Sequence, residues 1–157
     1  MDVNEFWELA RNAADLNPLH VWVGERVWGT VPPPAWAFGD SPELADALAQ
    51  QVASGAKTTT TSLLWEYEAE EADLPERGEL GIVLDGKDEP RALILTTDVR
   101  VVPFAEVDDE HALGEAVSLD EWRREHESFA RRADDGQHPF DPAMPVVLER
   151  FEVLYHR

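Results

Sequence analysis

A lysine followed by a run of hydroxyl side chains is the part of this sequence best suited to chemistry. Lys57 comes directly before four threonines, residues 58–61, and Ser62 follows them. Lysine is scarce here, since the chain contains only one other, Lys87, against eleven arginines. Unlike arginine, a buried lysine can lose its proton and act as a base beside a hydroxyl nucleophile. The residues predict either that chemistry or, more simply, a solvated polar face of a strand.

The β-branched side chains of residues 57–64 favour a strand. Alternation in a regular strand places Thr58, Thr60 and Ser62 on one face and Lys57, Thr59 and Thr61 on the other. Lys57 and Thr60 therefore meet only if the chain bends where the strand begins, near Gly55.

Three helices are expected to support this strand. The first covers residues 3–15, the second runs from its N-cap Ser41 to Gly55, and the third begins with a capping box of Ser118 and Glu121. Further strands are expected over residues 79–84, 91–97, 98–104 and 146–155, with irregular chain over residues 17–40 and loops over 66–78 and 134–145. Three tryptophans are expected to pin the irregular segment to the core: Trp22, Trp28 and Trp36. This order predicts an α+β domain with a small, mostly antiparallel sheet, able to close as a barrel with helices at its side.

The composition limits the classes of protein that fit. A chain of 157 residues with 43% hydrophobic residues suits one globular domain. It contains no cysteine, which excludes disulfides, thiolate metal sites and cysteine nucleophiles. No signal-like or membrane-spanning apolar run is visible, so we expect a soluble cytoplasmic protein without a membrane partner.

The net charge of −20 bears on the choice of partner. Long nucleic acids are bound by cations that displace counterions from phosphates, and an acidic surface repels phosphate. We therefore expect no long duplex nucleic acid as a partner, and a solvated acidic surface as the simplest reading of the charge.

Several common catalytic motifs are missing. The segment GAKT resembles the end of a phosphate-binding loop but lacks its upstream glycine, and no GxSxG motif is present. The five histidines show no metal-ligand spacing on one helix, so we expect neither a metal nor a cofactor. His126 fits a partly buried structural histidine better than a ligand or base.

Four segments in order resemble the ASCH domain family, in its bacterial single-domain branch: GAKTTTTSLLWEYE, LPERGELGIVLDGKDEPRALILTTDVRVVPFAEVDDEHA, SLDEWRREHESFA and FDPAMPVVLERFEVLY. The first of them contains the G-x-K-x-x-T core of the family. The resemblance implies a PUA-like fold, a small β-barrel flanked by helices. It places the ASCH domain at residues 36–157, preceded by an N-terminal helix and extension over residues 1–35.

The resemblance also implies site residues. One branch of the family hydrolyses the acetyl amide of N(4)-acetylcytidine with a lysine, a threonine and a glutamate. These roles correspond to Lys57, Thr60 and Glu115 as catalytic residues.

The surrounding residues suggest how a nucleoside would be held. Two pairs of aromatic side chains are expected to enclose a pyrimidine ring, although plain packing roles suit them too: Trp36 with Phe38, and Trp65 with Tyr67. Thr58 and Ser62 are expected to stabilise a developing oxyanion, and Arg123 and Arg150 to meet a ribose or a phosphate.

Three functions remain open at this point. The first is an amidohydrolase that removes an acyl group from a modified pyrimidine nucleoside, the second a non-catalytic RNA- or nucleotide-binding module, and the third a ribonuclease. The expected partner is a modified nucleoside or a short single-stranded RNA. A nucleoside suits the charge best, because it carries no phosphate.

Overall fold

The structure is a computed structural model that describes residues 1–16, 22–23, 26–27 and 31–157. Trp28 lies outside the described residues and the side chain of Trp22 outside the described side chains, so their expected packing stays a prediction. The chain forms two compact units, which are treated separately below. The first comprises residues 1–55, 78–95 and 152–157, and the second comprises residues 56–77 and 96–151.

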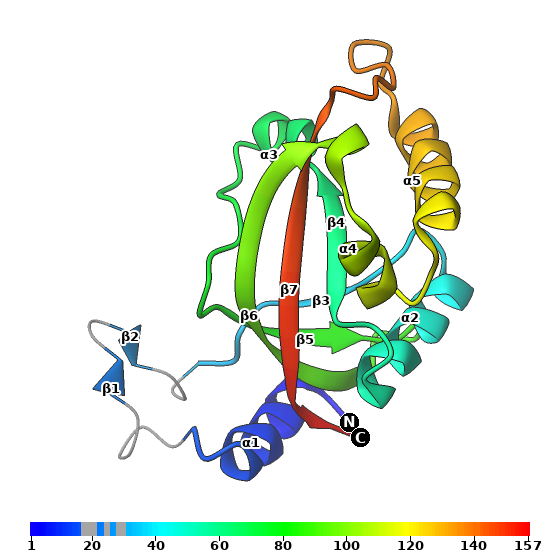
Figure 1. Cartoon of the computed structure of the whole chain (residues 1–157). Coiled ribbons are helices and arrows are strands. Elements are labelled where there is room, and N and C mark those ends of the chain that lie inside the picture. The colour runs from blue at the N-terminus through cyan, green and yellow to red at the C-terminus, as the bar shows by residue number, and fades with distance from the viewer. Residues whose placement is uncertain (17–21, 24–25, 28–30) are drawn as a thin grey trace. The chain divides into compact units, whose positions relative to one another are not determined.

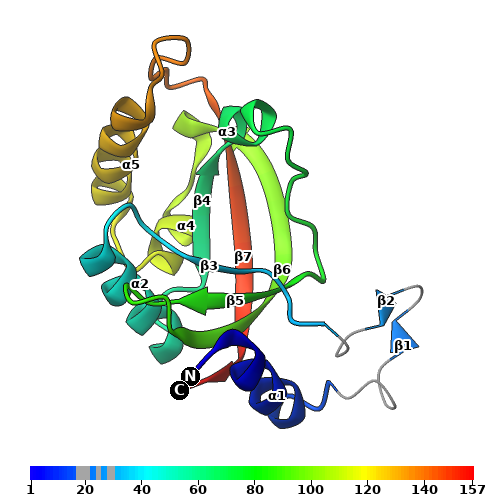
Figure 2. The ribbon, with the colours of Figure 1, turned by 180° about the vertical axis from the view of Figure 1, so that it is seen from behind.

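The first unit combines two helices with short strands. Helices α1 (Val3–Ala13) and α2 (Pro42–Ser54) accompany strands β1 (Trp22–Val23), β2 (Arg26–Val27), β3 (Ala35–Ala37) and β5 (Leu80–Leu84). Strand β5 pairs parallel with β3 and antiparallel with β6 (Pro90–Pro103), of which this unit holds the first part (Figure 2). Helix α2 begins and ends as expected, because Ser41 accepts a hydrogen bond from the Leu44 N–H and Gly55 has a φ of 84°.

The core of the first unit lies between α1 and the sheet. Phe6 and Trp7 on α1 pack with Ile82 of β5 and Leu93 of β6, and all four are nearly inaccessible to solvent. Gly81 is needed beside Trp36, since a Cβ at residue 81 would lie within 3 Å of the indole ring. Trp36 therefore packs directly against Gly81 of β5.

The second unit contains the lysine and threonine segment. It comprises β4 (Thr59–Leu63), α3 (Leu64–Ala69), the 3₁₀ helix η1 (Phe104–Glu106), α4 (Asp109–Gly114), α5 (Leu119–Ala133) and most of β7 (Pro145–His156) (Figure 1). Strands β4 and β7 pair antiparallel without a break, from Thr59 opposite Arg150 to Leu63 opposite Val146. Leu63 and Val146 pack with Phe104 and Trp122 in the core of this unit.

The predicted α+β class and mostly antiparallel sheet are confirmed, and the five strands follow the order β3-β5-β6-β7-β4. Some local predictions were wrong. Residues 64–69 form a helix where the end of a strand and the start of a loop were expected, residues 22–23, 26–27 and 35–37 form short strands where irregular chain was expected, and β6 runs through the point where two segments were expected. Residues 109–114, for which no element was predicted, form a helix. Among the described residues, no helix has the length and apolar character needed to cross a bilayer.

Candidate functional site

Lys57 is a buried cation, with only 2% of its surface exposed. Its ammonium group donates to the Thr59 carbonyl oxygen at 2.7 Å and to Glu115 Oε1 at 3.3 Å. A charged group removed from water in this way needs both hydrogen bonds and an opposite charge. Glu115, which directly follows α4, supplies the charge.

The Glu115 carboxylate is the centre of the site. Besides Lys57, Oε1 lies 3.4 Å from His126 Nε2. The other oxygen, Oε2, accepts from Thr61 Oγ1 at 2.7 Å and from Trp122 Nε1 at 2.6 Å, and lies 3.2 Å from His111 Nε2. We call these six residues the Glu115 cluster: Lys57, Thr61, His111, Glu115, Trp122 and His126.

Two short helical spacings bring the histidines and the indole to the carboxylate. His111 lies in α4 and Glu115 is the residue that caps its C-terminal end, so the two are four residues, about one helical turn, apart. The N-cap Asp108 fixes the start of that helix by accepting a hydrogen bond from the His111 N–H. Trp122 and His126 are also four apart, on α5, and their rings stack with centroids 4.3 Å apart. Helix α4 thus presents one partner to Glu115, and α5 presents two.

Helix α4 is attached directly to the chain around β4. The Thr58 N–H donates to the Gly114 carbonyl at 2.7 Å, and Thr59 Oγ1 donates to the His111 carbonyl at 2.8 Å. Gly114 makes this close approach feasible, because a Cβ there would lie 2.5 Å from two atoms of Thr59. The glycine therefore sets the distance between Glu115 and the strand.

Gly114→Ala is expected to destabilise the protein by about 1–3 kcal/mol, because the added methyl group forces α4 away from Thr59. Urea unfolding followed by circular dichroism measures this loss. Leu113→Ala is the control, since Leu113 is 72% exposed and its truncation should change stability by less than about 0.5 kcal/mol. Equal stability of the two variants would show that the contact is not tight.

The two charged groups of the cluster have shifted pKa values. Burial alone would raise the pKa of Glu115, but hydrogen bonds with His111 and His126 and the charge of Lys57 outweigh it and hold that pKa well below its ordinary value. Burial lowers the pKa of Lys57, and the charge and hydrogen bond of Glu115 oppose this shift without reversing it. Glu115 therefore stays ionised, and Lys57 releases its proton more readily than an exposed lysine.

The shift of Glu115 predicts a pH dependence of stability. Because its pKa is lower in the folded protein than in the unfolded chain, the stabilisation is complete above the ordinary pKa of 4.5 and is lost as the pH falls below it. Relative to Glu115→Gln, the wild type should lose about 1.4 kcal/mol of unfolding free energy per pH unit below that value. Urea unfolding of both proteins between about pH 6 and pH 3 measures the difference. A difference independent of pH would contradict the shift.

The structure corrects the expected pairing of Lys57 with Thr60. The ladder between β4 and β7 is continuous, so side chains alternate, and Thr60 lies on the face opposite Thr59 and Thr61. The hydroxyl group bonded to Glu115 belongs to Thr61. No bend brings Thr60 round to join Lys57 and Glu115.

Three other predicted residues belong to the Thr60 side of the strand. Thr58 and Ser62 alternate with Thr60, and the Tyr67 hydroxyl lies 3.4 Å from Ser62 Oγ. Burial raises the pKa of Tyr67. The predicted polar residues are therefore divided between two faces of one strand.

The predicted aromatic and arginine residues take separate positions. The Trp65 indole stacks on His138, with ring centroids 4.3 Å apart. Arg150 pairs with Glu110 at 3.1 Å, and Arg123 lines a pocket beside α5.

Trp36 and Phe38 belong to the first unit, where their rings meet edge to face at 6.1 Å. Their expected roles at a substrate stay predictions.

Sequence reasoning missed three members of the Glu115 cluster: Thr61, His111 and Trp122. The four-residue spacing from His111 to Glu115 was a readable signal, but only if residues 109–114 were recognised as a helix. His126 is partly buried, as expected, and its Nδ1 lies 2.8 Å from the Trp122 carbonyl. Within the described residues, no group of three or more histidine, aspartate and glutamate side chains has the geometry of a metal site.

Comparisons with known proteins agree with this fold. A protein of the DUF984 family from Enterococcus faecalis V583 has a crystal structure similar to this one, with a TM-score of 0.81 and 36% sequence identity over 96% of this chain and 86% of that chain. The crystal structure of an ASCH domain from Lactobacillus crispatus JV V101 gives a TM-score of 0.78 and 25% identity, over 97% of this chain and 96% of that chain. This similarity confirms the predicted PUA-like fold.

A search among curated proteins finds no match. The family model described as ASCH domain matches residues 34–155, which is most of the chain. The chain therefore belongs to the ASCH domain family.

Proposed function

We propose that this protein is an amidohydrolase that removes an acyl group from a modified pyrimidine nucleoside such as N(4)-acetylcytidine. One observation carries the proposal: a single carboxylate, Glu115, bonds both to a buried lysine and to a threonine hydroxyl group. Amide hydrolysis needs a nucleophile, a proton acceptor and a proton donor for the leaving amine, and the Glu115 cluster contains a group for each.

Thr61 is the proposed nucleophile, in place of the Thr60 that the sequence suggested. Its Oγ1 lies 2.8 Å from His111 Nε2 as well as 2.7 Å from Glu115. Glu115 is a weak base because its pKa is held so low, whereas His111 in the tautomer that carries its proton on Nδ1 can accept the hydroxyl proton at Nε2. Thr61 then forms an ester with the acyl group, and His111 holds the proton.

Lys57 is the proposed acid for the leaving amine. Its lowered pKa makes the ammonium group a better proton donor than an exposed lysine, and the partly exposed Glu115, bonded to it at 3.3 Å, relays the proton to the exocyclic nitrogen of the base. In the second half of the reaction water attacks the ester and gives a proton, again through Glu115, to the now neutral Lys57. His111 returns its proton to the Thr61 oxygen, so the enzyme is restored and one water molecule has been consumed.

Access and charge both suit a small neutral substrate. Thr61 and Glu115 keep part of their surface exposed, whereas Lys57 does not. The net charge of −20 repels phosphates, and a nucleoside carries none.

The two other functions make different predictions. A binding module would hold RNA or a nucleotide without turnover, and its affinity would fall steeply with salt if phosphates were contacted. A ribonuclease would cleave a short single-stranded RNA.

Incubation of the purified protein with N(4)-acetylcytidine tests the proposal, with cytidine and acetate measured by chromatography over time. We expect both products in equal amounts and no cleavage of a short single-stranded RNA. As a control, cytidine added at the start should slow the release of acetate, because the product competes with the substrate for the same site. A folded protein that binds the nucleoside without releasing acetate would support the binding module, and RNA cleavage would support the ribonuclease.

A further inference from the structure

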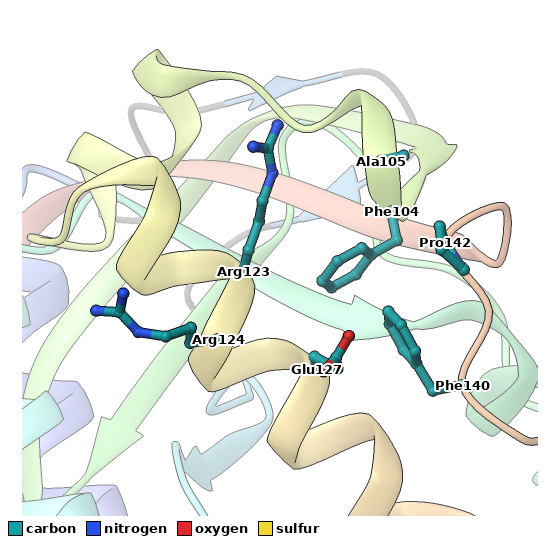
Figure 3. A pocket seen from close by; sticks show the side chains of 7 residues that line it. All are labelled: Phe104, Ala105, Arg123, Arg124, Glu127, Phe140 and Pro142. Carbon is teal, nitrogen blue, oxygen red and sulfur yellow. The ribbon is translucent and has the colours of Figure 1, made fainter.

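A pocket of about 330 Å³ lies beside α5 in the second unit (Figure 3). Two phenylalanine rings, Phe104 and Phe140, form part of its lining together with Arg123, Arg124 and Glu127 on the helix. Small-molecule sites typically have volumes of about 300–1,000 Å³, so this pocket has room for one ring with a substituent.

The phenylalanines give the pocket an aromatic wall. Phe104 and Phe140 meet edge to face, with centroids 4.9 Å apart and an angle of 87° between the ring planes. Figure 3 shows both rings on the same side of α5, with Glu127 between them and the helix. Such a pair offers both a ring face and a ring edge, the two surfaces that a further aromatic ring prefers to contact.

The helix gives the pocket a positive charge. The side chains of Arg123 and Arg124 make no hydrogen bond or ion pair with any other residue that the structure describes. The carboxylate in the lining, Glu127, is paired with Arg131 at 3.6 Å, and Arg131 also lies over the Phe140 ring. Both arginines are exposed, so in a chain with 33 acidic residues their guanidinium groups remain available to an anionic ligand.

Trp122 separates the pocket from the Glu115 carboxylate. Its side chain is completely buried, its indole N–H donates to Glu115, and its ring packs against Phe104 at a centroid distance of 5.0 Å. A ligand in the pocket would therefore contact the other side of Phe104 or its edge, and not Glu115. The pocket is a distinct site, and what it binds does not depend on the proposed function of the cluster.

We propose that this pocket binds a small planar aromatic ring that carries an anionic group. The ring packs against Phe104 and Phe140, and the anion is bound by Arg123, with Arg124 adding positive charge at the rim. In Figure 3 the two arginine side chains leave α5 in different directions, and Arg124 points to the side of the helix away from the two phenylalanine rings, so a single anion is held mainly by Arg123.

Isothermal titration calorimetry with phenyl phosphate tests the proposal. We expect saturable one-to-one binding to the wild type and an affinity lowered at least about tenfold by Arg123→Ala, because a charge-assisted hydrogen bond is lost. Phe140→Ala should also weaken binding, through loss of the ring contact. Arg100→Ala is the matched control, since it removes the same charge from an exposed arginine paired with Asp98 outside the pocket, and it should bind as the wild type does.

Two further probes test the ring and the charge separately. Inorganic phosphate and benzyl alcohol should each bind at least about tenfold more weakly than phenyl phosphate, because each lacks one of the two contacts. Phosphate binding as tight as that of phenyl phosphate would overturn the role of the ring, and equal binding of benzyl alcohol would overturn the role of the charge. Absence of binding, or equal losses in the Arg100→Ala and Arg123→Ala variants, would overturn the site itself.

Discussion

Thr61→Val should lower kcat/KM for N(4)-acetylcytidine at least about 1000-fold, because no other hydroxyl group takes the place of the nucleophile. Valine keeps the branched shape of threonine at the same place in β4. The remaining partners of Glu115, among them Lys57 and Trp122, still hold the carboxylate. The variant should therefore fold, and the loss should appear in kcat more than in KM, since the hydroxyl group acts on the bond that is broken.

Thr60→Val is the matched control for this experiment. It makes the same chemical change one residue earlier, on the opposite face of the same strand. Turnover by Thr60→Val should stay close to that of the wild type. The reverse result, an active Thr61→Val and an inactive Thr60→Val, would place the chemistry on the face that Thr60 shares with Ser62, and would contradict the mechanism proposed above.

The sequence predicted these elements well where local chemistry decides the structure. Helix α2 runs from Pro42 to Ser54 because Ser41 and Gly55 are its caps, and both caps are visible in the sequence. Ser118 likewise accepts from the Glu121 N–H at the start of α5. Cap residues act within a few positions of themselves, so they can be read without knowledge of the rest of the fold.

Prediction was weaker where packing decides which side of an element is buried. Leu44 is the first leucine of α2, yet it is 40% exposed, whereas the smaller Ala45 and Ala49 are buried. A small side chain is buried there because neighbouring elements come close, and that closeness depends on tertiary contacts.

Prediction of the candidate site was limited in the same way, because its residues come together through tertiary contacts. Alternation already placed Lys57 and Thr61 on one face of a regular strand. The G-x-K-x-x-T motif nevertheless pointed to Thr60. The short helix α4, with an acidic first turn and only six residues, gave too weak a signal to reveal that His111 and Glu115 act together.

Glu115→Gln should lower the free energy of unfolding by about 3–5 kcal/mol, because it leaves the ammonium group of Lys57 buried without an opposite charge. Urea unfolding at neutral pH measures the loss, and Glu110→Gln is the control. That carboxylate also belongs to α4, but its pair with Arg150 is exposed, so its loss should cost less than about 1 kcal/mol.

The double variant Lys57→Met with Glu115→Gln tests whether the two charges interact. It contains no buried unpaired charge, so its total loss of unfolding free energy should be smaller than the sum of the two single losses. Additive losses would show that the two charges do not interact, and the site would then lack the pairing that links its lysine to its threonine.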